Sequence, residues 1–312
     1  MPDIGKSGVV TNHFEVTLKP FAIAGMQLDL SALHENVTQM GQRLDVLMSI
    51  YPWVQMVVFS ELAPFGPLIA NAQVLPNPTE DHFRTWAKKH GIWLIPGSMF
   101  ERQGDLIYNT ATVINPEGEI VGRYRKMFPF KPYEEGVESG TEFMTFDVPN
   151  IGRFGMAICY DLWFPETART LAAMGAEVIL HPTLTGTIDR DVELAIVRAT
   201  AAQNQCFVFG INGFGDCGNG RSIIVGPAGE VLYQGQSATE MIPFEIDFNR
   251  VRRSREVGLR GLGQQLKSFR DRKVEFGVYA PEGRNWPYLN SLGPLQKAER
   301  GSMAGVQPKK PA

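Results

Sequence analysis

Cysteine is scarce in this chain, and its spacing carries no pattern. The 312 residues include three cysteines, Cys159, Cys206 and Cys217, and no two of them form a CxxC arrangement. An odd number without paired spacing argues against a disulfide framework and against a structural zinc site. We interpret Cys206, which lies in an apolar run, as a packing residue, and we expect Cys217 to be exposed in a glycine-rich turn.

The sequence also lacks a long apolar run, a strong net charge and a basic tract. Its apolar runs are strand-sized and fall short of the ~20 residues that a membrane-spanning helix requires. Residues 1–19 contain no apolar signal core. The formal net charge is −3, so nucleic acid is not an indicated partner. We therefore expect a cytoplasmic protein with neither membrane nor nucleic acid among its partners.

The composition is that of a globular enzyme-sized protein. Hydrophobic residues make up 44% and charged residues 20% of the chain, which is enough apolar material for a full core. No stretch is rich enough in linker residues to divide the chain. The predicted organisation is an arm over residues 1–19, one domain over 20–280 and a tail over 281–312.

Predicted strands and helices alternate along the chain in two similar runs. The expected strands are 21–29, 54–60, 92–100, 106–114, 119–126, 143–148, 152–160, 177–180, 206–212, 220–225, 230–233 and 241–246, and the expected helices are 34–51, 79–90, 167–175, 189–204 and 249–255. Each run contains a similar turn, Asn115-Pro116-Glu117-Gly118 or Gly226-Pro227-Ala228-Gly229, which indicates an internal duplication. The pattern favours an α/β fold in which two sheets pack face to face with helices outside.

Three polar side chains stand at the ends of otherwise apolar strands: Glu61, Lys126 and Cys159. Each has a plain structural explanation, as a loop cap, a solvated cation and a packed thiol respectively. Together they supply a general base, an oxyanion-stabilising cation and a nucleophile, the groups needed for acyl transfer from an amide. A helix that begins soon after Cys159 would also favour its thiolate.

These residues and their neighbours resemble the nitrilase, or carbon–nitrogen hydrolase, superfamily over residues 21–250. The shared motifs, in chain order, are Phe59-Ser60-Glu61, Tyr124-Arg125-Lys126, Ile158-Cys159-Tyr160-Asp161 and Phe164-Pro165-Glu166. The resemblance implies a four-layer αββα sandwich and a Glu61–Lys126–Cys159 triad that uses no metal or cofactor. It also implies a homodimer or higher homo-oligomer paired through the helices next to the cysteine, and we expect the tail over 281–312 to cover the partner subunit.

The residues around the cysteine resemble the amidase branch most. Nitrilases proper usually continue from the cysteine with Trp-Glu, whereas this chain continues with Tyr160-Asp161, as amidases and carbamoyl hydrolases do. N-carbamoyl-amino-acid hydrolases tend to place an arginine next, but here Leu162-Trp163 follows, so a substrate carboxylate loses its expected partner. Residues 127–136 resemble the loop of aliphatic amidases and formamidases. Those enzymes carry a second glutamate in this loop, and Glu134 matches it. Glu135, one residue away, is the alternative match. The alternative without a function is that both glutamates lie on a solvated loop.

The predicted reaction is hydrolysis of a small carboxamide to a carboxylic acid and ammonia through a Cys159 thioester. Lys126 and the Tyr160 N–H would hold the oxyanion, and Glu134 would position the substrate. The expected substrate-binding residues are Tyr160, Phe130, Tyr133, Trp163 and Thr183. We interpret His181 as making a structural hydrogen bond. The alternatives are an N-carbamoyl amide hydrolase or a nitrilase with the same triad, and a catalytically inactive scaffold or binding protein of the same fold.

Overall fold

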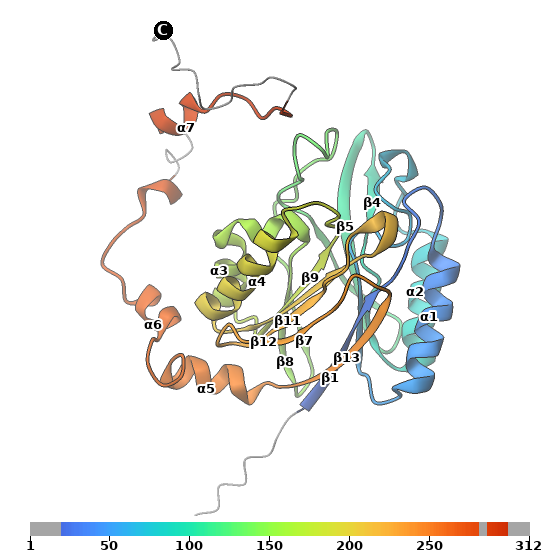
Figure 1. The fold of residues 1–312 in the computed structure, drawn as a ribbon, viewed down its shortest axis with the longest axis horizontal. Helices are drawn as coiled ribbons and strands as arrows, with labels where there is room; N and C mark the ends of the chain where they lie inside the picture. Colours follow the sequence, from blue (N-terminus) through green and yellow to red (C-terminus); the bar gives the residue numbers. More distant parts are fainter. Residues whose placement is uncertain (1–19, 281–285, 299–312) are drawn as a thin grey trace, which may run out of the picture.

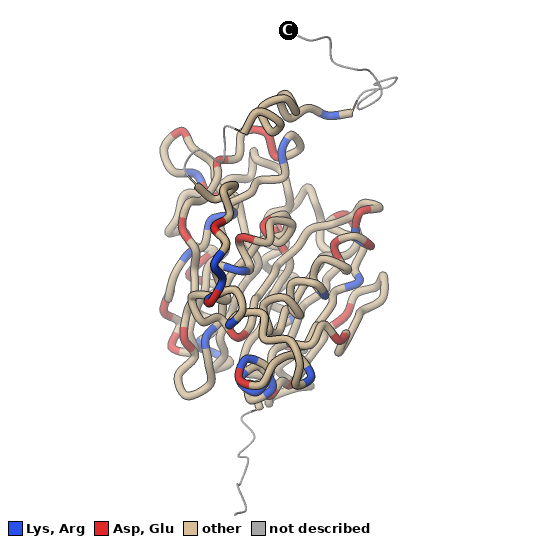
Figure 2. The backbone as a smooth tube through the Cα atoms, turned by 90° about the vertical axis from the view of Figure 1, so that its left-hand side faces the viewer, with Lys and Arg blue, Asp and Glu red and all other residues tan. Residues whose placement is uncertain are grey.

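The protein is a sandwich of two β-sheets with helices on both outer faces (Figure 1). The computed structural model describes residues 20–280 and 286–298. The predicted arm over 1–19 therefore lies outside the described residues, and so do 281–285 and 299–312 of the predicted tail. In Figure 2 positive and negative residues are mixed along the backbone, in keeping with the small net charge.

The first sheet has the strand order β13-β1-β2-β3-β5-β4, with β6 also paired to β5, and the second has the order β12-β11-β10-β9-β8-β7. The strands are β1 (Pro20–Gln27), β2 (Met56–Phe59), β3 (Trp93–Ile95), β4 (Ser98–Gln103), β5 (Leu106–Ile114), β6 (Ile120–Arg125), β7 (Thr145–Val148), β8 (Gly152–Met156), β9 (Val178–Thr183), β10 (Phe207–Asn212), β11 (Ile223–Val225), β12 (Val231–Gln234) and β13 (Glu240–Asp247). The α-helices are α1 (Val37–Ile50), α2 (Pro78–His90), α3 (Pro165–Ala173), α4 (Arg190–Asn204), α5 (Asn249–Val257), α6 (Gln265–Arg270) and α7 (Pro287–Ser291). Short 3-10 helices are η1 (Ile69–Asn71), η2 (Cys159–Trp163), η3 (Gly215–Cys217) and η4 (Gly277–Tyr279).

The two halves of the sandwich repeat one topology, as the duplicated turns predict. In the first half β1, β2 and β3 are parallel neighbours, and the antiparallel pair β5–β6 follows. In the second half β8, β9 and β10 are parallel neighbours, and the antiparallel pair β11–β12 follows. Both turns close in the same way, with Asn115 N–H donating to the Glu119 carbonyl over 3.0 Å and Gly226 N–H donating to the Glu230 carbonyl over 2.9 Å.

Three apolar clusters separate the four layers. One lies between the sheets and includes Phe21, Phe154 and Phe209. A second packs α1 and α2 on the first sheet, and a third packs α3 and α4 on the second. Strands buried on both faces read as near-continuous apolar runs, which is why β1, β2 and β10 are visible in the sequence.

The C-terminal part of the described chain leaves the sandwich after β13. Figure 1 shows α5, α6 and α7 following one another outside the sheets. Glycine and proline accumulate after Gly277, yet η4 and α7 form there within the described residues. No helix in residues 20–280 and 286–298 combines the length and apolar character needed to span a membrane.

The sequence-based prediction of one strand over 92–100 is wrong, because the chain breaks between β3 and β4. Gly97 has φ +81°, a left-handed conformation that ends the extended run. A Cβ at Gly97 would lie 2.0 Å from the Ser60 carbonyl oxygen. This close approach lets the turn pack directly against the residue that precedes Glu61.

Two further expectations are corrected around the cysteines. The strand predicted over 152–160 ends at Met156, and Cys159 instead opens η2. Cys217, expected to be exposed, is buried, because it packs in the cluster that includes Leu28 and Leu30 beneath the first helical layer.

Replacing Gly97 with alanine should lower the free energy of unfolding by at least about 2 kcal/mol, because strain at positive φ adds to a backbone clash. Gly91→Ala is the matched control. Gly91 also has positive φ, +62°, but its Cβ would meet nothing within 4 Å, so we expect a cost of about 1 kcal/mol. Urea unfolding of both variants measures the difference, and equal losses would contradict the close-packing argument.

Candidate active site

Glu61 follows β2 and is held between the two sheets. Its backbone N–H donates to the Thr183 carbonyl over 3.2 Å, which ties the end of β2 to the end of β9. The Glu61 residue is 1% exposed. Its Oε1 atom accepts hydrogen bonds from Lys126 Nζ and from Asn109 Nδ2, each over 2.8 Å.

Lys126 follows β6, and its ammonium group lies between two carboxylates. Nζ donates to Glu61 Oε1 over 2.8 Å and to Glu134 Oε2 over 2.7 Å. The Lys126 side chain is 1% exposed. Its backbone N–H donates to the Asn109 carbonyl over 2.8 Å, so the strand pairing of β5 and β6 continues up to the site.

The loop over residues 127–136 brings Glu134, not Glu135, to the lysine. Glu134 N–H donates to the Phe130 carbonyl over 2.9 Å, and Phe130 N–H donates back to Glu134 Oε2. These bonds form a tight turn that points the Glu134 carboxylate inward, whereas Glu135 is exposed. Asn109 Nδ2 also lies 3.4 Å from Glu134 Oε1.

Cys159 stands at the turn from β8 into η2 and has φ +45°. Asp161 holds this turn in place, since its Oδ2 accepts hydrogen bonds from Ile158 N–H over 2.9 Å and from Tyr124 Oη–H over 2.7 Å. Its other oxygen accepts Phe128 N–H over 2.8 Å. Burial raises the pKa of Asp161 to about 6. The carboxylate thus joins the cysteine turn to the segment that carries Lys126.

His181 makes the structural contact expected of it. Its Nε2 atom lies 2.8 Å from the Cys159 carbonyl oxygen, so Nε2 carries the proton in this bond. Burial lowers the pKa of His181. A neutral imidazole therefore supports the backbone of the turn that carries Cys159.

The electrostatics of the site keep the thiol protonated. Burial, followed by the negative charge of Glu61, raises the pKa of Cys159 well above its ordinary value. Burial and Glu61 therefore act against the thiolate that a following helix was expected to favour, and α3 begins only six residues later at Pro165. Burial also raises the pKa of Glu61. A neutral thiol beside this carboxylate requires a base to remove its proton at the moment of attack.

Lys126 remains charged despite its burial. Burial alone would lower the pKa of Lys126, but Glu61, then Cys159 and Glu134, raise it well above its ordinary value. An ammonium group has three N–H donors. Two of them reach the carboxylates, so one is left for a developing oxyanion.

A narrow cavity of ≈40 Å³ opens beside Cys159. It is lined by Phe130, Cys159, Tyr160, Trp163, Leu184, Thr185, Thr187, Asp189 and Glu193. Three of the predicted substrate-binding residues, Phe130, Tyr160 and Trp163, therefore lie together at the thiol. Their rings form one cluster, with centroids 5.0 Å apart for Phe130–Tyr160 and 5.8 Å apart for Tyr160–Trp163.

Tyr133 and Thr183 do not line this cavity. Tyr133 is 60% exposed and stacks on the outer side of Phe130, with ring centroids 5.1 Å apart. Thr183 is buried, and its hydroxyl donates to backbone carbonyls of His181 and Ile211 over 3.3 Å each. Thr185, two residues further on, takes the position at the cavity wall.

Sequence reasoning missed Asn109, Asp161 and Glu193 as members of the site. Asn109 lies within an apolar strand and Glu193 within an amphipathic helix, so neither marks a strand end. The one signal for Asn109 is a polar side chain at a position that the apolar alternation of β5 assigns to the interior. Among residues 20–280 and 286–298, no three His, Cys, Asp or Glu side chains are grouped to hold a metal ion.

Comparison with known proteins gives consistent results. The carbon–nitrogen hydrolase family model matches residues 21–256. The 2-oxoglutaramate amidase of Bacillus subtilis is 31% identical over 210 residues, which cover 64% of this chain and 81% of the relative. A nitrilase of Pyrococcus abyssi is 30% identical over 236 residues, covering 71% of this chain and 86% of the relative. The crystal structure of Saccharomyces cerevisiae Nit3, a member of the nitrilase superfamily, aligns with a TM-score of 0.71 at 24% identity over 76% of this chain and 94% of that one.

Iodoacetamide should alkylate Cys159 selectively in the folded protein. Cys159 is partly exposed, whereas Cys206 and Cys217 are buried, with pKa values raised by burial to about 12 and about 11. Because the pKa of the Cys159 thiol is also raised, its alkylation rate should increase about tenfold per pH unit between pH 7 and 9. Mass spectrometry of timed samples measures both effects. A rate that levels off below pH 8 would show instead that the thiolate forms at neutral pH.

Proposed function

This chain belongs to the carbon–nitrogen hydrolase family, and we propose that it hydrolyses a small carboxamide through a thioester on Cys159. One observation carries the proposal: the buried Lys126 ammonium group pairs with both Glu61 and Glu134 next to Cys159. Of the three described cysteines, Cys159 is the one that is partly exposed. This arrangement supplies a base, an oxyanion-stabilising cation and a nucleophile in one enclosed place.

The proposed first half-reaction forms the thioester. Glu61 accepts the thiol proton as the sulfur bonds to the amide carbon, and the carbonyl electrons move onto oxygen. The remaining donor of Lys126 and the backbone N–H of Tyr160 stabilise that oxyanion. Glu61 then returns the proton to the amide nitrogen, the C–N bond breaks, and ammonia leaves.

Water completes the proposed reaction. Glu61 removes a proton from a water molecule as its oxygen attacks the thioester, and the same proton goes to the departing sulfur. The products are a carboxylic acid and the free thiol. Glu134, bonded to Lys126 and to the Phe130 N–H, is the proposed positioning group for the amide and the water.

Cys159→Ala should abolish ammonia release while the protein stays folded, with a free energy of unfolding lowered by no more than about 2 kcal/mol, because one sulfur atom is removed from the edge of the apolar cluster between the sheets. Ammonia release from a panel of short amides and a parallel urea titration provide the two measurements. Turnover that survives in the folded variant would refute covalent catalysis at this residue.

Glu134→Gln should lower kcat/KM by at least about a hundredfold, because it removes one of the two charges that orient Lys126. Glu135→Gln is the matched control, since this neighbour is exposed, and its rate should stay within about twofold of the parent rate. Equal effects of the two substitutions would contradict the assignment of Glu134.

A nitrile is the second candidate substrate, since one relative is named a nitrilase. An N-carbamoyl amide is the third, because carbamoyl hydrolases share the Tyr160-Asp161 sequence after the cysteine. The three are separated by their products. Ammonia without carbon dioxide from an amide supports the amidase, carbon dioxide indicates a carbamoyl group, and acid formed from a nitrile indicates nitrilase activity.

A further inference from the structure

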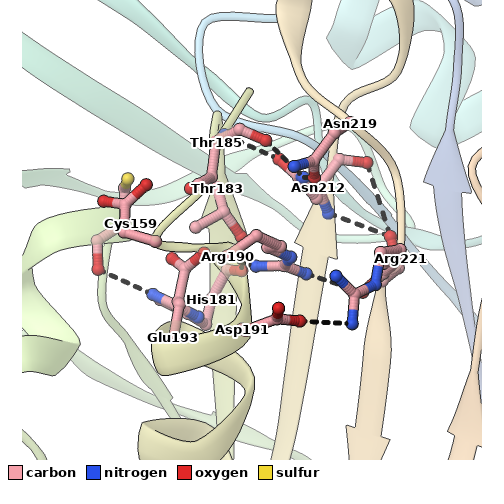
Figure 3. Close-up of polar contacts among 12 residues, drawn as sticks. Cys159, His181, Thr183, Thr185, Arg190, Asp191, Glu193, Asn212, Asn219 and Arg221 are labelled. Carbon is pink, nitrogen blue, oxygen red and sulfur yellow. Dashed lines mark hydrogen bonds and ion pairs between the residues drawn. The ribbon is translucent and has the colours of Figure 1, made fainter. Parts of the chain in front are cut away.

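Glu193 presents a buried carboxylate oxygen without a hydrogen-bond partner next to the nucleophile. Glu193 lies on α4, is 1% exposed and lines the same cavity as Cys159. Its Oε2 atom accepts a hydrogen bond from Arg190 Nη1 over 2.5 Å, whereas its Oε1 atom has no partner. In Figure 3 the Glu193 side chain lies on the Cys159 side of Arg190. A bare carboxylate oxygen is costly inside a protein, so its partner is expected to come from the cavity.

Arg190 does not make the cavity attractive to anions. Its Nη1 atom donates to Glu193 and its Nη2 atom donates to the Arg221 carbonyl over 2.8 Å. The residue is 1% exposed and is not among those that line the cavity. Figure 3 shows the guanidinium turned from the thiol towards Arg221. Its charge is therefore used to hold Glu193 in place.

The cavity wall itself is acidic. Besides Glu193 it includes Asp189, which precedes α4, and none of its nine lining residues is Lys, Arg or His. The remaining lining residues are aromatic, aliphatic or hydroxyl-bearing side chains and the thiol. The field that Glu193 exerts reaches the reacting group, because its negative charge contributes to the raised pKa of Cys159.

We propose that the substrate is a short carboxamide that bears an ammonium group at the end away from the amide, and that Glu193 Oε1 and the Asp189 carboxylate bind this group. The inference rests on the proposed amidase function and adds the class of acyl chain. An ammonium group donates three hydrogen bonds and needs acceptors only. A substrate carboxylate would instead face two acids in a cavity that no Lys, Arg or His lines. The volume of ≈40 Å³ favours a chain of a few methylene groups.

The decisive experiment compares matched amides with the unmodified enzyme. One set is 3-aminopropanamide, butanamide and succinamate, and the second set is longer by one methylene: 4-aminobutanamide, pentanamide and glutaramate. Within each set the end group is a cation, a methyl or a carboxylate. We expect kcat/KM for the cation to exceed that for the methyl analogue by at least about tenfold in one set, and the anion to be the poorest substrate in both.

Glu193→Gln tests the residue itself while keeping the size of the side chain. It should lower the ratio of kcat/KM for the cationic amide to kcat/KM for the methyl analogue by about tenfold or more, mainly through a higher KM for the cationic amide. Asp191→Asn is the matched control on the same helix. Asp191 is 76% exposed in its side chain and pairs with Arg221 on the outer side, so all three amides should keep their rates.

The outcomes separate this inference from the proposed function. If no amide releases ammonia, the proposed function is wrong and the inference falls with it. If the methyl or carboxylate amide is hydrolysed as fast as the cation, the amidase stands and the inference is overturned. Should Glu193→Gln fail to fold because Arg190 is left unpaired, the comparison with the unmodified enzyme still decides. A Glu193→Gln variant that slows all three amides equally would show that Glu193 has only a structural role.

Discussion

The site depends on one buried ammonium group. Lys126 is withdrawn from water, and a lone buried cation would lose its proton or unfold its surroundings. Glu61 and Glu134 hold the charge, each through a hydrogen bond shorter than 3 Å. These groups come from the end of β2, the end of β6 and the following loop, so satisfying one cation requires all three to converge.

Cys159, the proposed nucleophile, is positioned from the other half of the duplicated fold. Glu61 belongs to the first repeat and Cys159 to the second, and the hydrogen bond from Glu61 N–H to the Thr183 carbonyl joins them. Asp161 and His181 hold the backbone on either side of the thiol. In the proposed reaction the thiol stays neutral until Glu61 removes its proton as the substrate is attacked.

The sequence was most informative where chemistry coincides with the end of an element. Glu61 follows the apolar strand β2 and Lys126 directly follows β6, so both residues were predictable as polar side chains at strand ends. Residues 92–100 were misassigned because the apolar run continues through Pro96-Gly97, and only the approach of Gly97 to Ser60 reveals the break. Cys217 was misassigned because the glycines next to it in the sequence indicate a loop but give no information about the apolar cluster against which Cys217 packs.

The sequence by itself determined the alternation of strands and helices, the duplicated turns and the three reactive side chains, because these are local patterns of period, turn chemistry and residue type. The tertiary structure alone decided which polar residues join them. Asn109 and Asp161 find partners on distant segments, where nothing in the neighbouring sequence specifies the distance. Glu193 pairs with Arg190 on its own helix, and only the packing of α4 brings it to the cavity beside Cys159. The tertiary structure also decided that Glu134 faces the lysine and Glu135 faces water, since one step along a tight turn reverses the direction of a side chain.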